Sequence, residues 1–150
     1  MMALCSLLIE TIQSYREGLP TTYSGELTRC KQMRRVPKPY RIPQRTRVSG
    51  VGAFRRFFQH FRVEFDGLSG TEFYRKIRSG LLHQAQTKGG WRLAANRARL
   101  WERKTIDRNL FADQLQLAFE RHLTELARAD WTSVIWLNTR RKIWWLIRLS

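Results

Sequence analysis

Residues 107–128 read DRNLFADQLQLAFERHLTELAR, which is the clearest helical pattern in the chain. Its apolar residues recur at steps of three and four, as on a helix that turns one face toward a core. These residues are Phe111, Leu115, Ala118, Phe119, Leu123 and Leu126. Asp107 and Asp113 lie near the expected N-terminal end, where the helix dipole favours negative charge. The pattern predicts an amphipathic helix and, with it, a mainly α fold.

We expect this helix to belong to a small helical body of about three to four helices that occupies residues 54–130. Residues 54–66 contain a stripe of aromatic side chains at helical spacing, followed by an alternating pattern typical of an extended exit. Large apolar residues usually pack inside a protein, so this stripe is expected in the core. Its members are Phe54, Phe57, Phe58 and Phe61.

Two more helices are predicted between the stripe and residue 107. The first covers 71–84, with Thr71 as its N-cap. Its inward residues are expected to be Phe73, Ile77, Leu81 and Leu82. The glycines of Lys88-Gly89-Gly90 then break the helix, and residues 91–104 predict the second one.

The N-terminal residues 1–19 predict a further amphipathic helix, which Gly18 and Pro20 end. The apolar run at 2–9 has no cationic segment before it, as a secretory signal would have. It is also far shorter than the roughly 20 residues that cross a bilayer. We therefore expect a packing helix, and import into an organelle without a cleaved presequence remains open.

Residues 20–53 are expected to form an extended basic arm. Pro37, Pro39 and Pro43 each favour an extended conformation in the residue before them. Tyr40 and Ile42 interleave the charges, which is more than a passive linker requires. Such a composition becomes ordered most readily on a polyanion.

The charge of the chain points to the same kind of partner. Lys and Arg number 28 against 12 Asp and Glu, which gives a net charge of +16. Residues 27–63 hold eleven of these cations and no acid, so the excess is clustered. A solitary neutral enzyme is disfavoured, and the two cysteines exclude a disulfide-dense scaffold and a four-cysteine zinc site.

The tail, residues 131–150, is rich in tryptophan and consists of two apolar runs around a polar break. It fits either a hairpin or a helix. Such an apolar surface must be covered by the core, a partner or a lipid interface. We expect partner docking through Trp131, Trp136, Trp144 and Trp145.

No catalytic pattern accompanies these features. The sequence has no Walker loop, no dinucleotide glycine pattern and no HExxH motif. His60, His83 and His122 are widely spaced, without Cys or acid companions at ligand spacing. We therefore expect a non-enzymatic protein with no metal and no cofactor.

Arginine is the residue type best suited to RNA, because its planar fork binds phosphate in a bidentate way and stacks on bases. The sequence thus predicts a structural RNA-binding subunit of a large ribonucleoprotein, with a mitochondrial ribosomal protein that contacts rRNA and neighbouring subunits as the leading candidate. The expected RNA-binding residues are Arg34, Arg35, Lys38, Arg41, Arg45, Arg47, Arg55 and Arg56, with Arg97, Arg99, Arg140 and Arg141 as secondary positions.

A resemblance supports an alternative. Phe73-Tyr74-Arg75 resembles the Leu-Tyr-Arg signature of the LYR family of small mitochondrial complex subunits and assembly factors, with Phe in place of Leu. It implies a non-catalytic accessory subunit of a mitochondrial membrane-bound complex, touching the membrane without spanning it. A viral nucleic-acid-binding accessory protein, which would form a homo-oligomer, is a third reading.

Overall fold

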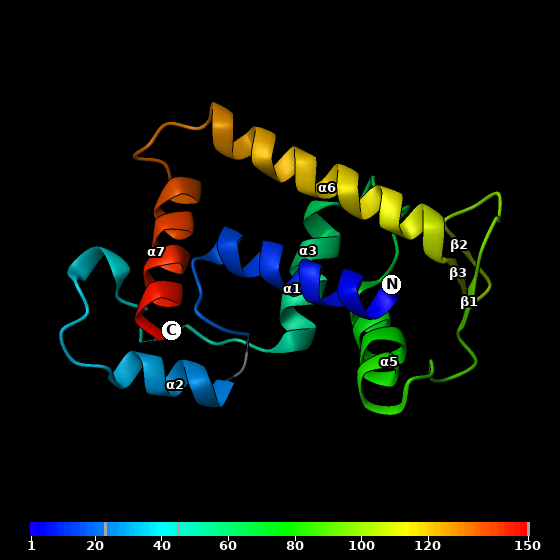
Figure 1. Cartoon of the computed structure of the whole chain (residues 1–150), viewed down its shortest axis with the longest axis horizontal. Coiled ribbons are helices and arrows are strands. Elements are labelled where there is room, and N and C mark those ends of the chain that lie inside the picture. The colour runs from blue at the N-terminus through cyan, green and yellow to red at the C-terminus, as the bar shows by residue number, and fades with distance from the viewer. Residues whose placement is uncertain (23, 45, 150) are drawn as a thin grey trace.

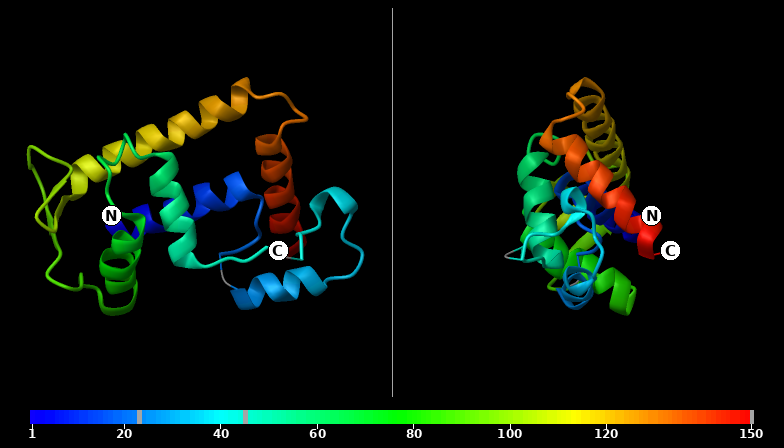
Figure 2. Two further views of the ribbon diagram at one scale, coloured as in Figure 1. Left: turned by 180° about the vertical axis from the view of Figure 1, so that it is seen from behind. Right: turned by 90° about the vertical axis from the view of Figure 1, so that its left-hand side faces the viewer.

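The computed structural model describes residues 1–22, 24–44 and 46–149, and it is mainly helical, with 62% helix and 5% strand. The long helix α6 runs from a small sheet at one end toward α7 at the other, and α1 and α3 cross beneath it (Figures 1 and 2). The helices are α1 (Met2–Glu17), α2 (Ser24–Gln32), η1 (Lys38–Tyr40), α3 (Gly50–His60), α4 (Gly70–Glu72), η2 (Phe73–Arg78), α5 (Ser79–Gln84), α6 (Arg108–Arg128) and α7 (Val134–Leu149). The strands are β1 (Arg92–Ala94), β2 (Trp101–Glu102) and β3 (Thr105–Asp107).

Helix α6 confirms the helix predicted from residues 107–128. Asp107 is its N-cap, and Oδ1 accepts hydrogen bonds from the backbone N–H groups of Asn109 and Leu110, both at 2.9 Å. The first half of the apolar stripe is buried as expected. In the second half, Phe119 and Leu123 remain 37% and 46% exposed and line a groove between α1, α6 and α7.

The main core is built on phenylalanine. Phe54, Phe57, Phe58 and Phe61 are all buried, so the predicted stripe is core. Phe73 and Phe111 stack across it with centroids 5.0 Å apart and planes 5° from parallel. Buried residues of α1 complete this core, namely Met2, Cys5, Ile9 and Ile12.

The helix predicted over 71–84 exists, and it begins at Gly70. Its cap is Ser69, whose Oγ accepts from the N–H of Glu72 at 3.4 Å, and not Thr71. Residues Phe73–Arg78 form a π-helical segment in its middle. The Tyr74 of the Phe-Tyr-Arg tripeptide lies edge-on to Phe54 at 5.3 Å, so it serves the core.

The prediction of a helix over 91–104 is wrong. Residues 92–94 and 101–102 form β1 and β2, and β3 lies between them, parallel to β1 and antiparallel to β2. Asn96, Arg103 and Lys104 have left-handed φ angles of 61°, 45° and 62°, which a right-handed helix cannot contain. The Asp107 carboxylate also accepts from the N–H of Arg97 at 2.7 Å and fixes the turn between β1 and β2.

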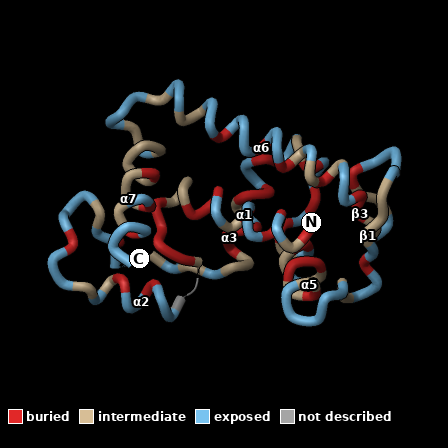
Figure 3. Tube along the Cα trace, in the orientation of Figure 1, coloured by how far each residue is buried: buried red, intermediate tan, exposed pale blue. Residues whose placement is uncertain are grey.

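The segment expected as an extended arm, residues 20–53, is partly helical and is folded onto the molecule. Helix α2 lies upstream of Pro37, and α3 begins at Gly50. Apolar residues of the segment meet α7 in a second core made of Leu19, Leu27, Cys30, Val36, Ile42 and Trp145. The charged side chains between them stay outside, which Figure 3 shows as isolated buried positions along an exposed trace.

The tail is a helix and not a hairpin, and it begins at Val134 after a turn. It crosses close to the C-terminal end of α1, where the Asn138 Nδ2 group donates to the carbonyl of Arg16 at 2.6 Å. Gly18 ends α1 with a left-handed φ of 64°, and a Cβ there would lie 2.8 Å from the Asn138 Cα. Glycine is therefore required at this crossing.

Candidate nucleic-acid interface

Among the described residues, five carboxylates form ion pairs with arginines of the fold. The pairs are Arg78–Glu10 (2.7 Å), Arg121–Glu64 (2.6 Å), Arg16–Glu125 (2.6 Å), Arg56–Glu17, and Arg97 and Arg99 with Glu102 (3.8 and 3.6 Å). Because 28 cations face 12 acids, this pairing leaves a large excess of positive charge on the surface.

The excess gathers on residues 31–47, and we call Lys31, Arg34, Arg35, Lys38, Arg41 and Arg47 the arm cluster. All of them except the half-buried Lys31 are exposed. Lys31, Arg34, Arg35 and Arg41 line one hollow of about 370 Å³ between α2, the following loop and α7. Of the residues that the structure describes, no carboxylate lines this hollow. The structure thus brings together three of the predicted RNA-binding arginines, whereas Arg45 lies outside the described residues.

Backbone contacts hold the arm cluster in place. The Lys31 Nζ group donates to the carbonyls of Gln44 and Thr46 at 2.7 and 2.6 Å, which ties the loop back to α2. The Arg41 Nε group donates to the carbonyl of Val36 at 3.0 Å and leaves both terminal nitrogens of the guanidinium for other partners. The cationic surface is therefore ordered before any ligand arrives.

The other predicted arginines fall into two groups. Arg55 is exposed on α3. Arg56 is engaged by Glu17, and Arg97 and Arg99 lie beside Glu102, so their charge is already partly balanced. Glu17 lies far from Arg56 in the sequence, and Arg97 and Arg99 share Glu102. Counting charges along the chain therefore does not reveal that these arginines are paired.

The predicted site residues of the tail also make contacts within the chain. Arg141 donates to the carbonyl of Pro39 at 3.4 Å and thus borders the arm; burial lowers the pKa of its guanidinium. Arg140 covers the ring of Trp131 at 4.5 Å. Trp131 is nevertheless 56% exposed, and Trp136 lies beside it with ring centroids 4.8 Å apart.

Trp144 and Trp145 pack against this chain itself, Trp144 in part and Trp145 completely, so burial leaves only Trp145 without a surface for the predicted partner docking. Trp144 stacks on Tyr40 with centroids 5.5 Å apart. Trp145 is fully buried. The second core therefore contains Trp145 and packs against Trp144.

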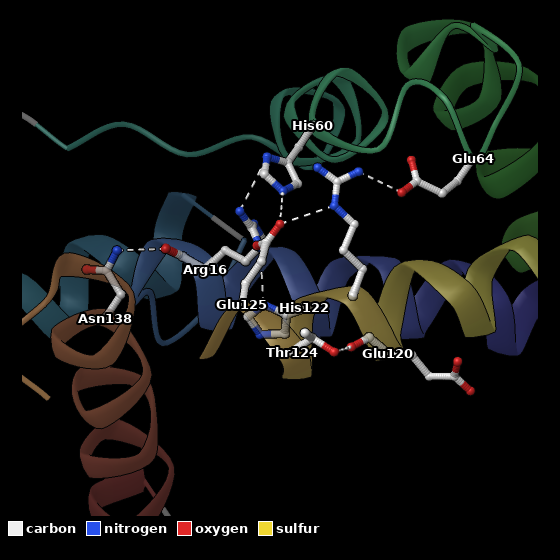
Figure 4. A network of polar contacts seen from close by, with 9 residues as sticks. Arg16, His60, Glu64, Glu120, His122, Thr124, Glu125 and Asn138 are labelled. Atoms are coloured by element: carbon white, nitrogen blue, oxygen red, sulfur yellow. Dashed lines mark hydrogen bonds and ion pairs between the residues drawn. The ribbon is translucent and has the colours of Figure 1, made fainter. Parts of the chain in front are cut away.

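A polar network that sequence reasoning missed joins α1, α3 and α6 (Figure 4). Glu125 accepts from Arg16 at 2.6 Å and contacts the Nε2 of His60 at 3.1 Å. The Nδ1 of His122 lies 3.1 Å from the Arg16 Nη1. The two histidines, widely spaced in the sequence, thus acquire an acid companion in space.

Electrostatics fix the protonation of this network. Burial lowers the pKa of His122, and the charge of Arg16 lowers it further. For Glu125, burial opposes ionisation, but the hydrogen bonds and charges of Arg16 and His60 bring its pKa below the ordinary value. The resting forms are therefore a neutral imidazole at His122 and a charged carboxylate at Glu125, and both groups already have a partner within the protein.

Metal ligands, thiols and membrane-spanning helices are the other features on which a function could rest. Within the described ranges, no three His, Cys, Asp or Glu side chains are grouped so as to hold a metal ion. Cys5 and Cys30 are buried, and burial raises the pKa of both thiols. Of the helices that the structure describes, none has the length and apolar character to cross a membrane.

Comparisons of the chain with protein-family models, with curated proteins and with solved structures gave no match.

Proposed function

We propose that this chain is a structural RNA-binding subunit of a large ribonucleoprotein particle, with a mitochondrial ribosome as the leading candidate. The observation that carries the proposal is the arm cluster, in which exposed arginines surround a hollow that none of the described carboxylates lines. Guanidinium groups in such a cluster bind phosphates in a bidentate way, and each phosphate contact releases counterions.

Exposed apolar residues support a place inside an assembly. A groove of about 270 Å³ between α1, α6 and α7 is lined by Leu8, Ile12, Phe119, Leu123 and Leu126 among others. On α7, Ile147 is 75% exposed. Exposed apolar surface of this kind is usually covered by a neighbouring subunit.

The same apolar surface favours the second candidate, a non-catalytic accessory subunit of a mitochondrial membrane-bound complex. In that setting the groove and α7 would meet protein at the membrane edge, and the arm cluster would face anionic headgroups or acidic subunits. Sedimentation of the endogenous protein separates the candidates. Co-sedimentation with ribosomal particles that nuclease abolishes supports the first, and co-migration with a detergent-solubilised complex supports the second.

The decisive test on the purified chain is the salt dependence of RNA binding. A variant with Arg34, Arg35, Lys38 and Arg47 changed to Gln loses four charges of the arm cluster. A matched variant changes Arg62, Arg75, Arg92 and Arg128, which are also exposed. For single-stranded RNA, the slope of log affinity against log salt should fall by about 3 in the first variant and stay near the native value in the second. Equal slopes in the two variants would remove the arm cluster from the proposal.

A further inference from the structure

We propose that the hollow of the arm cluster is a nucleotide pocket, which binds the phosphate of one nucleotide on its arginines and the base on its apolar floor. The inference rests on the proposed function, because it takes a nucleotide unit as the ligand, either extruded from single-stranded RNA or free in solution. It adds a specific site to a surface that otherwise offers only charge.

The size and the rim of the hollow fit such a ligand. Its volume of about 370 Å³ lies within the range of small-molecule sites, which is roughly 300 to 1,000 Å³. Arg34 and Arg35 are exposed at the rim, and neither has a hydrogen bond or an ion pair with another described residue. Arg41 adds a guanidinium whose terminal nitrogens bond to no other described residue. Three arginines thus line one hollow, and none of the described carboxylates does.

The floor of the hollow, unlike its rim, is lined by apolar residues. Met33 lines it and is half-buried, and Val36 and Ile42 beside it are 7% and 6% exposed, whereas the fully buried Trp145 supports this lining and offers a ligand no surface of its own. A site for phosphate alone has no need of an apolar floor, whereas an unstacked base requires one. The cationic rim over the apolar floor therefore matches the two halves of a nucleotide.

No described carboxylate lines the hollow itself. The acid nearest in sequence, Glu26, lines an adjoining hollow, which shares Cys30 and Met33 with this one. The wall formed by Lys31 is fixed by its bonds to the carbonyls of Gln44 and Thr46. The pocket is consequently shaped in the free protein, and little ordering is needed on binding.

Calorimetric titration of the full chain with AMP and with inorganic phosphate at fixed ionic strength tests the pocket. AMP should bind about tenfold more tightly than phosphate, because base stacking adds to the phosphate contact. The double variant Arg34→Gln/Arg35→Gln should weaken AMP binding by about tenfold or more, since two charge-assisted contacts are lost. The matched double variant Arg29→Gln/Arg62→Gln should change it less than about twofold, because both side chains lie outside the hollow.

Three results would overturn the pocket: no binding of AMP at millimolar concentration, equal binding of AMP and phosphate, or equal losses in the two double variants. Each of them leaves the salt dependence of RNA binding, and thus the proposed function, to be decided separately. Displacement of AMP by a single-stranded RNA of ten nucleotides, and not by a duplex of that length, assigns the ligand to RNA. Bound AMP that neither RNA displaces assigns it to a free nucleotide.

Discussion

The indole Nε1 of Trp145 donates to the backbone carbonyl of Tyr40 at 3.1 Å, across 105 residues of sequence. The neighbouring Trp144 stacks on the ring of that same Tyr40. The C-terminal helix therefore holds the basic loop from behind, while the loop presents its charges to the outside. The second core exists because of this contact, and the position of the arm cluster depends on it.

Replacement of Trp145 by Ala should release the arm. The change removes a fully buried indole and should destabilise the fold by about 3–5 kcal/mol. Trypsin, which cuts after Arg and Lys, should then cleave residues 29–47 much faster than in the native chain. The control is Trp131→Ala, whose side chain is 56% exposed and whose removal should change the cleavage rate little. Equal cleavage in both variants would show that α7 does not hold the arm.

Two glycines in helices should respond in opposite directions to Ala. At Gly70 an added Cβ would lie 2.4 Å from the carbonyl oxygen of Phe54, so α3 and α4 must separate. We expect Gly70→Ala to lower the free energy of unfolding by about 1–3 kcal/mol. At Gly25, on α2, nothing lies within 4 Å, and Gly25→Ala should raise it by about 0.5–1 kcal/mol. Urea unfolding curves measure both changes, and a stabilising Gly70→Ala would contradict the close packing.

Elements whose signal is local were predictable. Helix α6 has both a cap and a sustained apolar period, and the Phe54–Phe61 stripe repeats at helical spacing. By contrast, residues 91–104 have apolar spacing compatible with a helix, but tertiary contacts decide their structure. The Asp107 carboxylate, ten residues downstream, binds the N–H of Arg97 and turns the chain there.

The candidate site was only half predictable for a related reason. The acid-free run of cations is visible in the sequence, but which cations are balanced depends on contacts across the fold. Arg56 meets Glu17 only because α3 packs on α1, and His60 meets Glu125 only because α3 approaches α6. The fold of the arm was missed because Val36 and Ile42, buried among charges, have their partner Trp145 about a hundred residues away.

The Asp107 carboxylate should be among the most important single groups for stability. It is fully buried and accepts three backbone N–H groups, from Arg97, Asn109 and Leu110, and these bonds lower its pKa. Asp107→Ala leaves all three donors without an acceptor, so we expect a loss of about 2–3 kcal/mol in thermal or urea unfolding. Asp113→Ala, at an exposed position of the same helix, should change stability by less than about 0.5 kcal/mol. Similar losses in the two variants would refute the capping role.

The polar network of α1, α3 and α6 should make the fold sensitive to mild acid. Burial lowers the pKa of His122, so the native state binds fewer protons than the unfolded state as the pH falls below about 6.5. Stability is therefore level above that pH and decreases below it, with a maximal slope of about 1.4 kcal/mol per pH unit for one proton. Glu125, whose pKa is lowered mainly by Arg16 once burial is overcome, adds a second loss nearer pH 4.

The variant His122→Gln isolates the histidine in this pH dependence. Gln keeps a polar group opposite Arg16 but does not titrate, so unfolding free energies measured from pH 7.5 to 5.0 should lose most of their slope. The control is His83→Gln on α5, where the side chain is exposed and the slope should remain native. Among the groups that face His122, Arg16 and His60 repel its proton and Glu125 attracts it. If the slope persists in His122→Gln at its native size, another group governs the acid response, and the buried imidazole is not the one that the fold keeps neutral.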